Sequence, residues 1–84
     1  MPPIAEEIYQ IISYAGRSMT INEIVETWNI FHPALLANYK KIYNAIYREW
    51  ERNNYVFYND NQFGDCRIGI EEAYYRPNGR VAGP

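Results

Sequence analysis

The chain of 84 residues contains one cysteine, Cys66, and one histidine, His32. A single cysteine excludes an internal disulfide, and no Cys/His cluster suggests zinc, which suits a reducing cytoplasm. A lone histidine beside Pro33, without a Cys, Asp or Ser partner, is expected to be a loop residue rather than part of a metal site or triad. The sequence also lacks a glycine-rich phosphate loop and a nucleophile elbow. These absences predict a protein that is not an enzyme and needs no cofactor or metal.

Long apolar runs and an excess of positive charge are also missing. No apolar run approaches the roughly 20 residues that a helix needs to cross a bilayer. The first residues lack the pattern of a secretory signal, so we expect a cytoplasmic or nucleoid-associated protein without membrane contact. The net charge is −2, whereas domains that bind nucleic acid through phosphates tend to be basic. Any contact with DNA is therefore expected to depend on a local basic patch.

The N-terminal half has the periodicity of two amphipathic helices. Apolar residues recur at helical spacing at Ile4, Ile8, Ile11 and Ile12. They predict a first helix over about residues 3–15, ended by Gly16 as its C-terminal cap. Ser18–Thr20 is long enough only for a strand stub. Thr20 followed by Glu23 fits a capping box, so a second helix is predicted from residue 21 to about 29 or 30.

A third helix is predicted from Pro33 to about Asn53, either continuous or broken once near Ala37 or Asn38. At about 100° per residue, one face of this helix is apolar and the opposite face is polar. The residues expected on the buried face are Leu35, Tyr39, Ile42, Ile46 and Trp50, flanked by Leu36, Tyr43 and Tyr47. Those expected on the opposite face are Ala37, Lys41, Asn44 and Arg48, flanked by Lys40, Glu51 and Arg52.

The C-terminal part has the composition of a β-hairpin. Strand-like residues over 55–58 precede a polar turn over 59–64 and a second strand over 66–70, in which Cys66 is expected to be half-buried. Residues 73–84 have little periodicity and are predicted to be a flexible tail, or an arm that becomes ordered on a partner. The predicted fold is thus an α+β winged helix-turn-helix in residues 1–72, with three helices followed by a two-stranded β-hairpin wing.

Three short motifs resemble the HARE-HTH family of winged helices. They are Ala15-Gly16-Arg17-Ser18-Met19-Thr20, Glu23-Ile24, and Ile42-Tyr43-Asn44-Ala45-Ile46-Tyr47-Arg48-Glu49. The resemblance covers about residues 4–72. Members of this family occur in chromatin regulators, restriction endonucleases and the delta subunit of bacterial RNA polymerase. The resemblance therefore implies a module that contacts DNA or a protein of the transcription machinery. The chain departs from a basic wing, because residues 59–62 and Asp65 make this one neutral to acidic.

The polar face of the third helix is the candidate DNA-binding surface. In a recognition helix, Asn44 would pair with adenine and Arg48 with guanine in the major groove. The residues expected to contact the DNA backbone are Lys40, Lys41, Arg52, Arg67 on the wing, and Arg17 before the second helix. The alternative is an ordinary solvated surface. In that case Lys41 and Arg48 pair with Glu49 or Glu51, Arg67 balances Asp65, and Arg17 is a surface charge.

Nine tyrosines exceed what so small a core can hold. Interfaces favour tyrosine, so Tyr9, Tyr47, Tyr74 and Tyr75 are candidates for a protein contact or a homodimer seam. The leading hypothesis is a small transcription or mobile-element regulator that binds double-stranded DNA, gaining specificity as a homodimer. The alternative is a winged helix that binds and modulates a polymerase, a nuclease or another nucleic-acid-processing complex. A phage-encoded inhibitor would belong to this second class.

Overall fold

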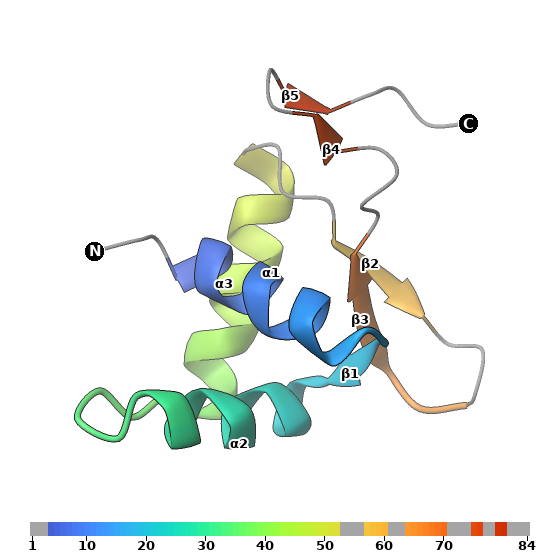
Figure 1. Cartoon of the computed structure of the whole chain (residues 1–84). Coiled ribbons are helices and arrows are strands. Elements are labelled where there is room, and N and C mark those ends of the chain that lie inside the picture. Colours follow the sequence, from blue (N-terminus) through green and yellow to red (C-terminus); the bar gives the residue numbers. More distant parts are fainter. Residues whose placement is uncertain (1–3, 53–56, 61–63, 71–74, 77–78, 81–84) are drawn as a thin grey trace.

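Three helices and a three-stranded antiparallel sheet form the fold, as Figure 1 shows for the computed structural model. It describes residues 4–52, 57–60, 64–70, 75–76 and 79–80, and of residues 49–52, 75–76 and 79–80 only the backbone. The helices are α1 (Ile4–Ala15), α2 (Ile21–Phe31) and α3 (Tyr39–Arg52). The strands of the sheet are β1 (Met19–Thr20), β2 (Phe57–Asp60) and β3 (Arg67–Ile70). This arrangement confirms the predicted α+β winged helix-turn-helix, with one strand more than the predicted wing.

The predicted ends of α1 and α2 are supported by local hydrogen bonds. Gly16 ends α1 with a φ of +71°, and its N–H donates to the Ile12 carbonyl at 3.0 Å. A positive φ of this kind favours glycine, which has no Cβ. The predicted capping box at the start of α2 is present in both directions, between Thr20 and Glu23. Both helices therefore begin or end where their sequence signals place them.

The sequence predicts that His32 is a loop residue without a partner, whereas in the structure His32 contacts residues of both α2 and α1. It follows the last residue of α2, and its backbone N–H donates to the Trp28 carbonyl at 2.8 Å. Its ring lies 4.5 Å from the Trp28 ring, and its Nε2 is 3.2 Å from Oε2 of Glu7 on α1. The end of α2 is therefore attached to α1 by a side chain that sequence reasoning left without a partner.

The predicted start of the third helix at Pro33 is wrong. Residues 32–38 form a connection without helix, and α3 begins only at Tyr39. The Asn38 side chain accepts the backbone N–H of Lys41 at 2.8 Å, which is the bond of an N-terminal cap. The connection is also held to α2, because Ala37 exchanges two hydrogen bonds with the Asn29 side chain and Leu35 accepts one from the Trp28 indole.

This connection changes which residues are buried. Leu35 and Tyr39, expected on the buried face, are 41 % and 51 % exposed, whereas Ala37, expected on the polar face, is buried. Residues 32–38 are not helical, so the helical spacing that placed Leu35 on the buried face does not apply there, and Ala37, held by the Asn29 side chain, belongs to the core instead. Ile42 and Ile46 are fully buried, as predicted. The Trp50 side chain lies outside the described residues.

The sheet has the order β1-β3-β2, with both pairs antiparallel. The stub β1 pairs Met19 with Ile68, which adds the third strand to the predicted hairpin. Strand β2 continues to Asp60, so the prediction that the turn begins at Asn59 is wrong. Cys66 precedes β3 and is exposed, not half-buried as predicted, because it has no place in the strand ladder.

The core lies between the three helices and the sheet. Its fully buried side chains are Ile8, Ile12, Ile24, Ile42, Ile46, Phe57 and Ile68. Within the predicted tail, β4 (Tyr75–Arg76) pairs antiparallel with β5 (Gly79–Arg80), and the other residues of 73–84 lie outside the described residues. None of the helices that the structure describes has the length and apolar character needed to cross a bilayer.

Candidate nucleic-acid interface

One face of α3 carries a row of polar side chains. Lys40, Asn44 and Arg48 follow one another at intervals of four residues, and all three are exposed. Lys41, beside them, is partly buried. Among the described side chains, none forms an ion pair with Lys40, Lys41 or Arg48. The structure therefore presents this row to solvent, where an external partner can reach it.

The side chains of two residues of the predicted surface, Glu51 and Arg52, and of the expected ion-pair partner Glu49 lie outside the described residues. Arg52 ends α3, and Glu49 and Glu51 lie in its last turn. The expected ion pairs of Lys41 or Arg48 with Glu49 or Glu51 thus fall outside the described residues. The polar row on α3, as far as the structure describes it, consists of Lys40, Asn44 and Arg48.

A row of tyrosines runs along α3 next to the polar row. The rings of Tyr39 and Tyr43 are stacked with their centroids 6.1 Å apart, and those of Tyr43 and Tyr47 are 4.5 Å apart. The Tyr47 hydroxyl donates to Asn59 Oδ1 on β2 at 2.9 Å. Burial raises the pKa of Tyr47, and Cys66 raises it further. Tyr47 thus connects α3 to the wing, whereas Tyr39 and Tyr43 remain exposed.

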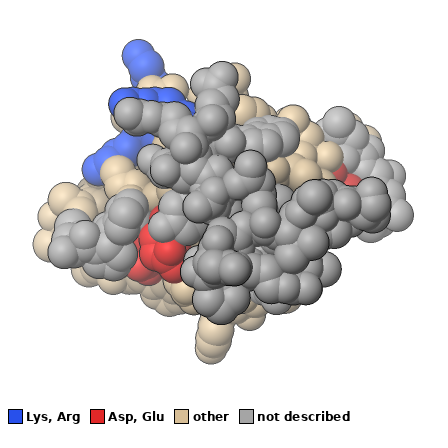
Figure 2. Space-filling model, turned by 90° about the horizontal axis from the view of Figure 1, so that it is seen from above, with Lys and Arg blue, Asp and Glu red and all other residues tan. Residues whose placement is uncertain are grey.

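Positively and negatively charged side chains are separated on the face of the molecule that Figure 2 shows. In the view of Figure 2, the visible Lys and Arg side chains gather at one edge of the molecule, and the visible acidic side chains lie outside this group. A protein with a formal charge of −2 can therefore still present a basic area. This separation is what a local patch for phosphates requires.

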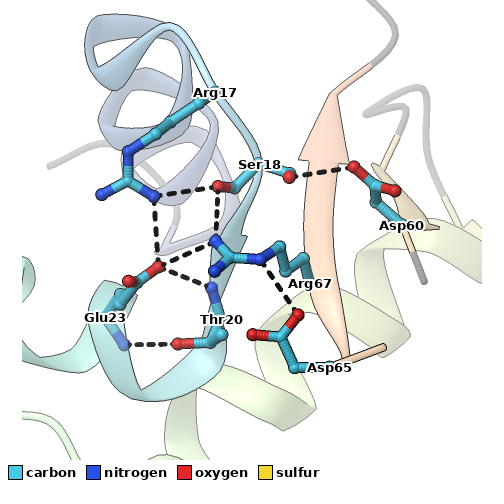
Figure 3. A network of polar contacts seen from close by, with 7 residues as sticks. All are labelled: Arg17, Ser18, Thr20, Glu23, Asp60, Asp65 and Arg67. Carbon is cyan, nitrogen blue, oxygen red and sulfur yellow. Dashed lines mark hydrogen bonds and ion pairs between the residues drawn. The ribbon is translucent and has the colours of Figure 1, made fainter. Parts of the chain in front are cut away.

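Arg17 and Arg67 lie outside α3 and were also predicted to contact the DNA backbone. Figure 3 shows that both arginines point toward Glu23. Arg17 Nη1 lies 3.3 Å from Glu23 Oε1, and Arg67 Nη1 lies 3.5 Å from the same oxygen. Both guanidinium groups also donate to the Ser18 carbonyl, at 3.1 and 3.4 Å. The Glu23 carboxylate accepts the Thr20 N–H at 3.0 Å as well. We call Arg17, Ser18, Thr20, Glu23 and Arg67 the Glu23 cluster.

Two aspartates of the wing extend the Glu23 cluster. Arg67 Nε donates to Asp65 at 3.1 Å, which is the pairing expected if Arg67 balances Asp65. The Ser18 hydroxyl donates to Asp60 at 3.0 Å. These contacts join the turn after α1, the first turn of α2 and the two strands of the wing. Arg17 and Arg67 therefore have acidic partners, whereas no described side chain forms an ion pair with the polar row on α3.

The Glu23 cluster lowers the pKa of Glu23 below its ordinary value of 4.5. The main cause is the hydrogen bond from the Thr20 backbone, and Arg17 and Arg67 add to it against the opposing effect of burial. A carboxylate with a lowered pKa stabilises the fold in its charged form. This contribution is complete above the unfolded pKa and is lost as the pH falls through the folded pKa.

We expect Glu23→Gln to destabilise the protein at neutral pH by about 0.5–1 kcal/mol, because half of the capping box is weakened. The loss of stability below about pH 4.5 should become shallower than in the wild type. Urea unfolding measured between neutral pH and about pH 3 tests both effects. Arg17→Gln is the graded control and should change the acid limb less, since Thr20 is the larger cause. Parallel acid limbs in wild type and Glu23→Gln would contradict the role of this carboxylate.

The structure describes the side chains of two of the four tyrosines that were predicted to contact a protein. Tyr9 and Tyr47 are partly buried and pack against the core, and the side chains of Tyr74 and Tyr75 lie outside the described residues. The exposed apolar residues are instead mostly at the end of α2 and in the following connection, with Ile30 74 % and Leu36 65 % exposed, beside Phe31 and Leu35. Sequence reasoning missed this surface because it assigned Leu35 and Leu36 to a helix face that packs on the core.

The described residues contain no group of three or more His, Cys, Asp or Glu side chains arranged to hold a metal ion. Comparison with known proteins found no protein-family model, no curated protein and no solved structure that matches the chain. The structure itself shows a winged helix-turn-helix fold with exposed polar and tyrosine residues on α3.

Proposed function

We propose that this protein is a non-enzymatic DNA-binding winged helix, a small regulator of transcription or of a mobile element, which places α3 in the major groove. The supporting observation is that Lys40, Asn44 and Arg48 lie exposed on one face of α3 without a described ion pair. Asn and Arg can each make two hydrogen bonds to a base edge, and Lys can neutralise a phosphate. This is the combination of side chains that a recognition helix needs.

The Glu23 cluster has a supporting role in this proposal. Arg17 and Arg67 would have to leave Glu23 and Asp65 to contact DNA, so they are assigned to the positioning of the wing relative to α2. The α3 face then supplies the larger share of the contacts. A homodimer would bring two such faces to half-sites about one helical turn of DNA apart and so multiply a modest affinity.

Salt titration of binding to random-sequence duplex DNA tests this proposal. Lys40, Lys41 and Arg48 would neutralise about three phosphates, so log K should fall against log[salt] with a slope of about −3. Fluorescence anisotropy with a labelled duplex measures the slope. A protein that does not bind the duplex even at low salt is not a DNA-binding protein, and binding without salt dependence would exclude phosphate contacts.

A second candidate function is favoured by the exposed apolar residues between α2 and α3. Ile30, Phe31 and Leu36 offer apolar surface next to α3, and such surface commonly marks a protein contact. In this alternative the winged helix binds and modulates a polymerase, a nuclease or another nucleic-acid-processing complex. Capture of the same partner from the native cell before and after nuclease treatment, lost in Leu36→Asp, would support it. Capture that depends on nucleic acid would contradict it.

A further inference from the structure

Two aromatic rings lie beside the polar row of α3 and are open to solvent. Tyr39 and Tyr43 are 51 % and 43 % exposed, and each directly precedes a member of the polar row, Lys40 or Asn44. Their rings are nearly parallel, with an interplanar angle of 22°. They therefore form one apolar ridge, which we call the Tyr39–Tyr43 ridge, along the side of α3 that adjoins the polar row, since successive residues of a helix point about 100° apart.

The major groove of DNA offers mainly one kind of apolar group to such a ridge. The base edges there are hydrogen-bond donors and acceptors, except for the C5 methyl group of thymine. Asn44, next to Tyr43 in the chain, has the side chain that pairs with adenine, the partner base of thymine. The ridge and Asn44 are thus suited to the two bases of one kind of pair.

Resting on the DNA-binding function proposed above, we propose that α3 reads A·T base pairs. Asn44 pairs with the N6 and N7 atoms of adenine, while Tyr43, supported by Tyr39, packs against the thymine methyl group. This contact removes apolar surface of the tyrosine rings and of the methyl group from water, which favours binding. In the free protein the two rings remain exposed to water. Arg48, one helical turn further, is left for a guanine or a phosphate at the edge of the site.

Three duplexes of equal length test this assignment: alternating A·T, the same duplex with uracil in place of thymine, and alternating G·C. Replacing thymine by uracil removes only the methyl group, so phosphates and adenine edges remain the same. We expect the A·T duplex to bind at least tenfold tighter than the G·C duplex. We expect uracil to weaken binding by about fourfold for each methyl contact, the factor that corresponds to burying one carbon group.

Variants separate the two parts of the assignment. Tyr43→Ala should abolish the difference between thymine and uracil, whereas Tyr43→Phe should keep it, because the ring makes the contact. Asn44→Ala should reduce the preference for A·T over G·C and leave the thymine–uracil difference. Tyr14→Ala on α1, where the ring is 88 % exposed, is the control and should change neither. Circular dichroism checks that each variant is folded.

The possible outcomes distinguish this inference from the function on which it rests. Equal affinity for the thymine and uracil duplexes, together with salt-dependent binding to both, overturns the methyl contact and leaves DNA binding intact. Equal affinity for the A·T and G·C duplexes overturns the base assignment as a whole. Failure to bind any of the three duplexes at low salt overturns the proposed function itself.

Discussion

Ile46→Ala is expected to destabilise the protein by about 2–5 kcal/mol, since it removes three carbon atoms from a fully buried site and leaves a cavity. Ile46 and Ile42 lie on the face of α3 that packs against the core, which also contains Phe57 of β2. Domains are typically stable by about 5–15 kcal/mol, and one of this size is expected near the lower limit. The substitution should therefore lower the melting temperature by roughly 10–30 °C.

Urea unfolding followed by circular dichroism measures this effect on the free energy of unfolding. Tyr14→Ala is the matched control, because it truncates a larger side chain that is 88 % exposed, and it should change stability by less than about 0.5 kcal/mol. If Ile46→Ala were as stable as the wild type, α3 would not pack through its apolar face. In that case the polar face of α3 would not be shown to face solvent either, because its exposure depends on the burial of the opposite face.

The parts of the fold that the sequence predicts depend on local signals. A capping box needs only Thr20 and Glu23 three residues apart, and the helix end at Gly16 needs only one positive φ. The burial of Ile42 and Ile46 follows from spacing within a single helix. Such features are decided by neighbours in the chain, so a single sequence is sufficient to read them.

The start of α3 was mispredicted because two local signals compete. Pro33 is suited to the first turn of a helix, and Asn38 is suited to the cap that precedes one. In the structure α3 begins after Asn38, and the Asn29 side chain holds Ala37 outside the helix with hydrogen bonds of 2.8 and 3.2 Å. These bonds link residues that lie apart in the chain, and only the packing of α2 against the connection brings them together.

The Glu23 cluster could be predicted only in part. The bond between Glu23 and Thr20 is local, and Arg17 lies nearby in the sequence. Arg67 reaches Glu23 because β3 pairs with β1, which places Arg67 opposite Thr20 in the register. Strand register depends on contacts distant in sequence, so the cluster becomes visible only in the folded chain.

Lys40→Gln/Arg48→Gln is expected to weaken binding to duplex DNA by about 2–4 kcal/mol, or roughly 30- to 1,000-fold. The reason is that it removes one phosphate contact and one base or phosphate contact from the exposed row of α3. The salt slope should become less negative by about two if both cations contact phosphates, and by about one if Arg48 contacts a base. Anisotropy measured at several salt concentrations gives both quantities.

The net charge of the protein changes by two in that variant, so a control with the same change elsewhere is needed. Gln10→Glu/Tyr14→Glu adds two negative charges at exposed positions of α1. If the α3 row binds DNA, this control should weaken binding only through long-range repulsion, by a few-fold at low salt and less as salt screens it. Since Lys40 and Arg48 are exposed, their replacement should leave stability within about 0.5 kcal/mol of the wild type. Equal losses of affinity in the two variants would mean that total charge, and not the α3 row, governs the interaction with DNA.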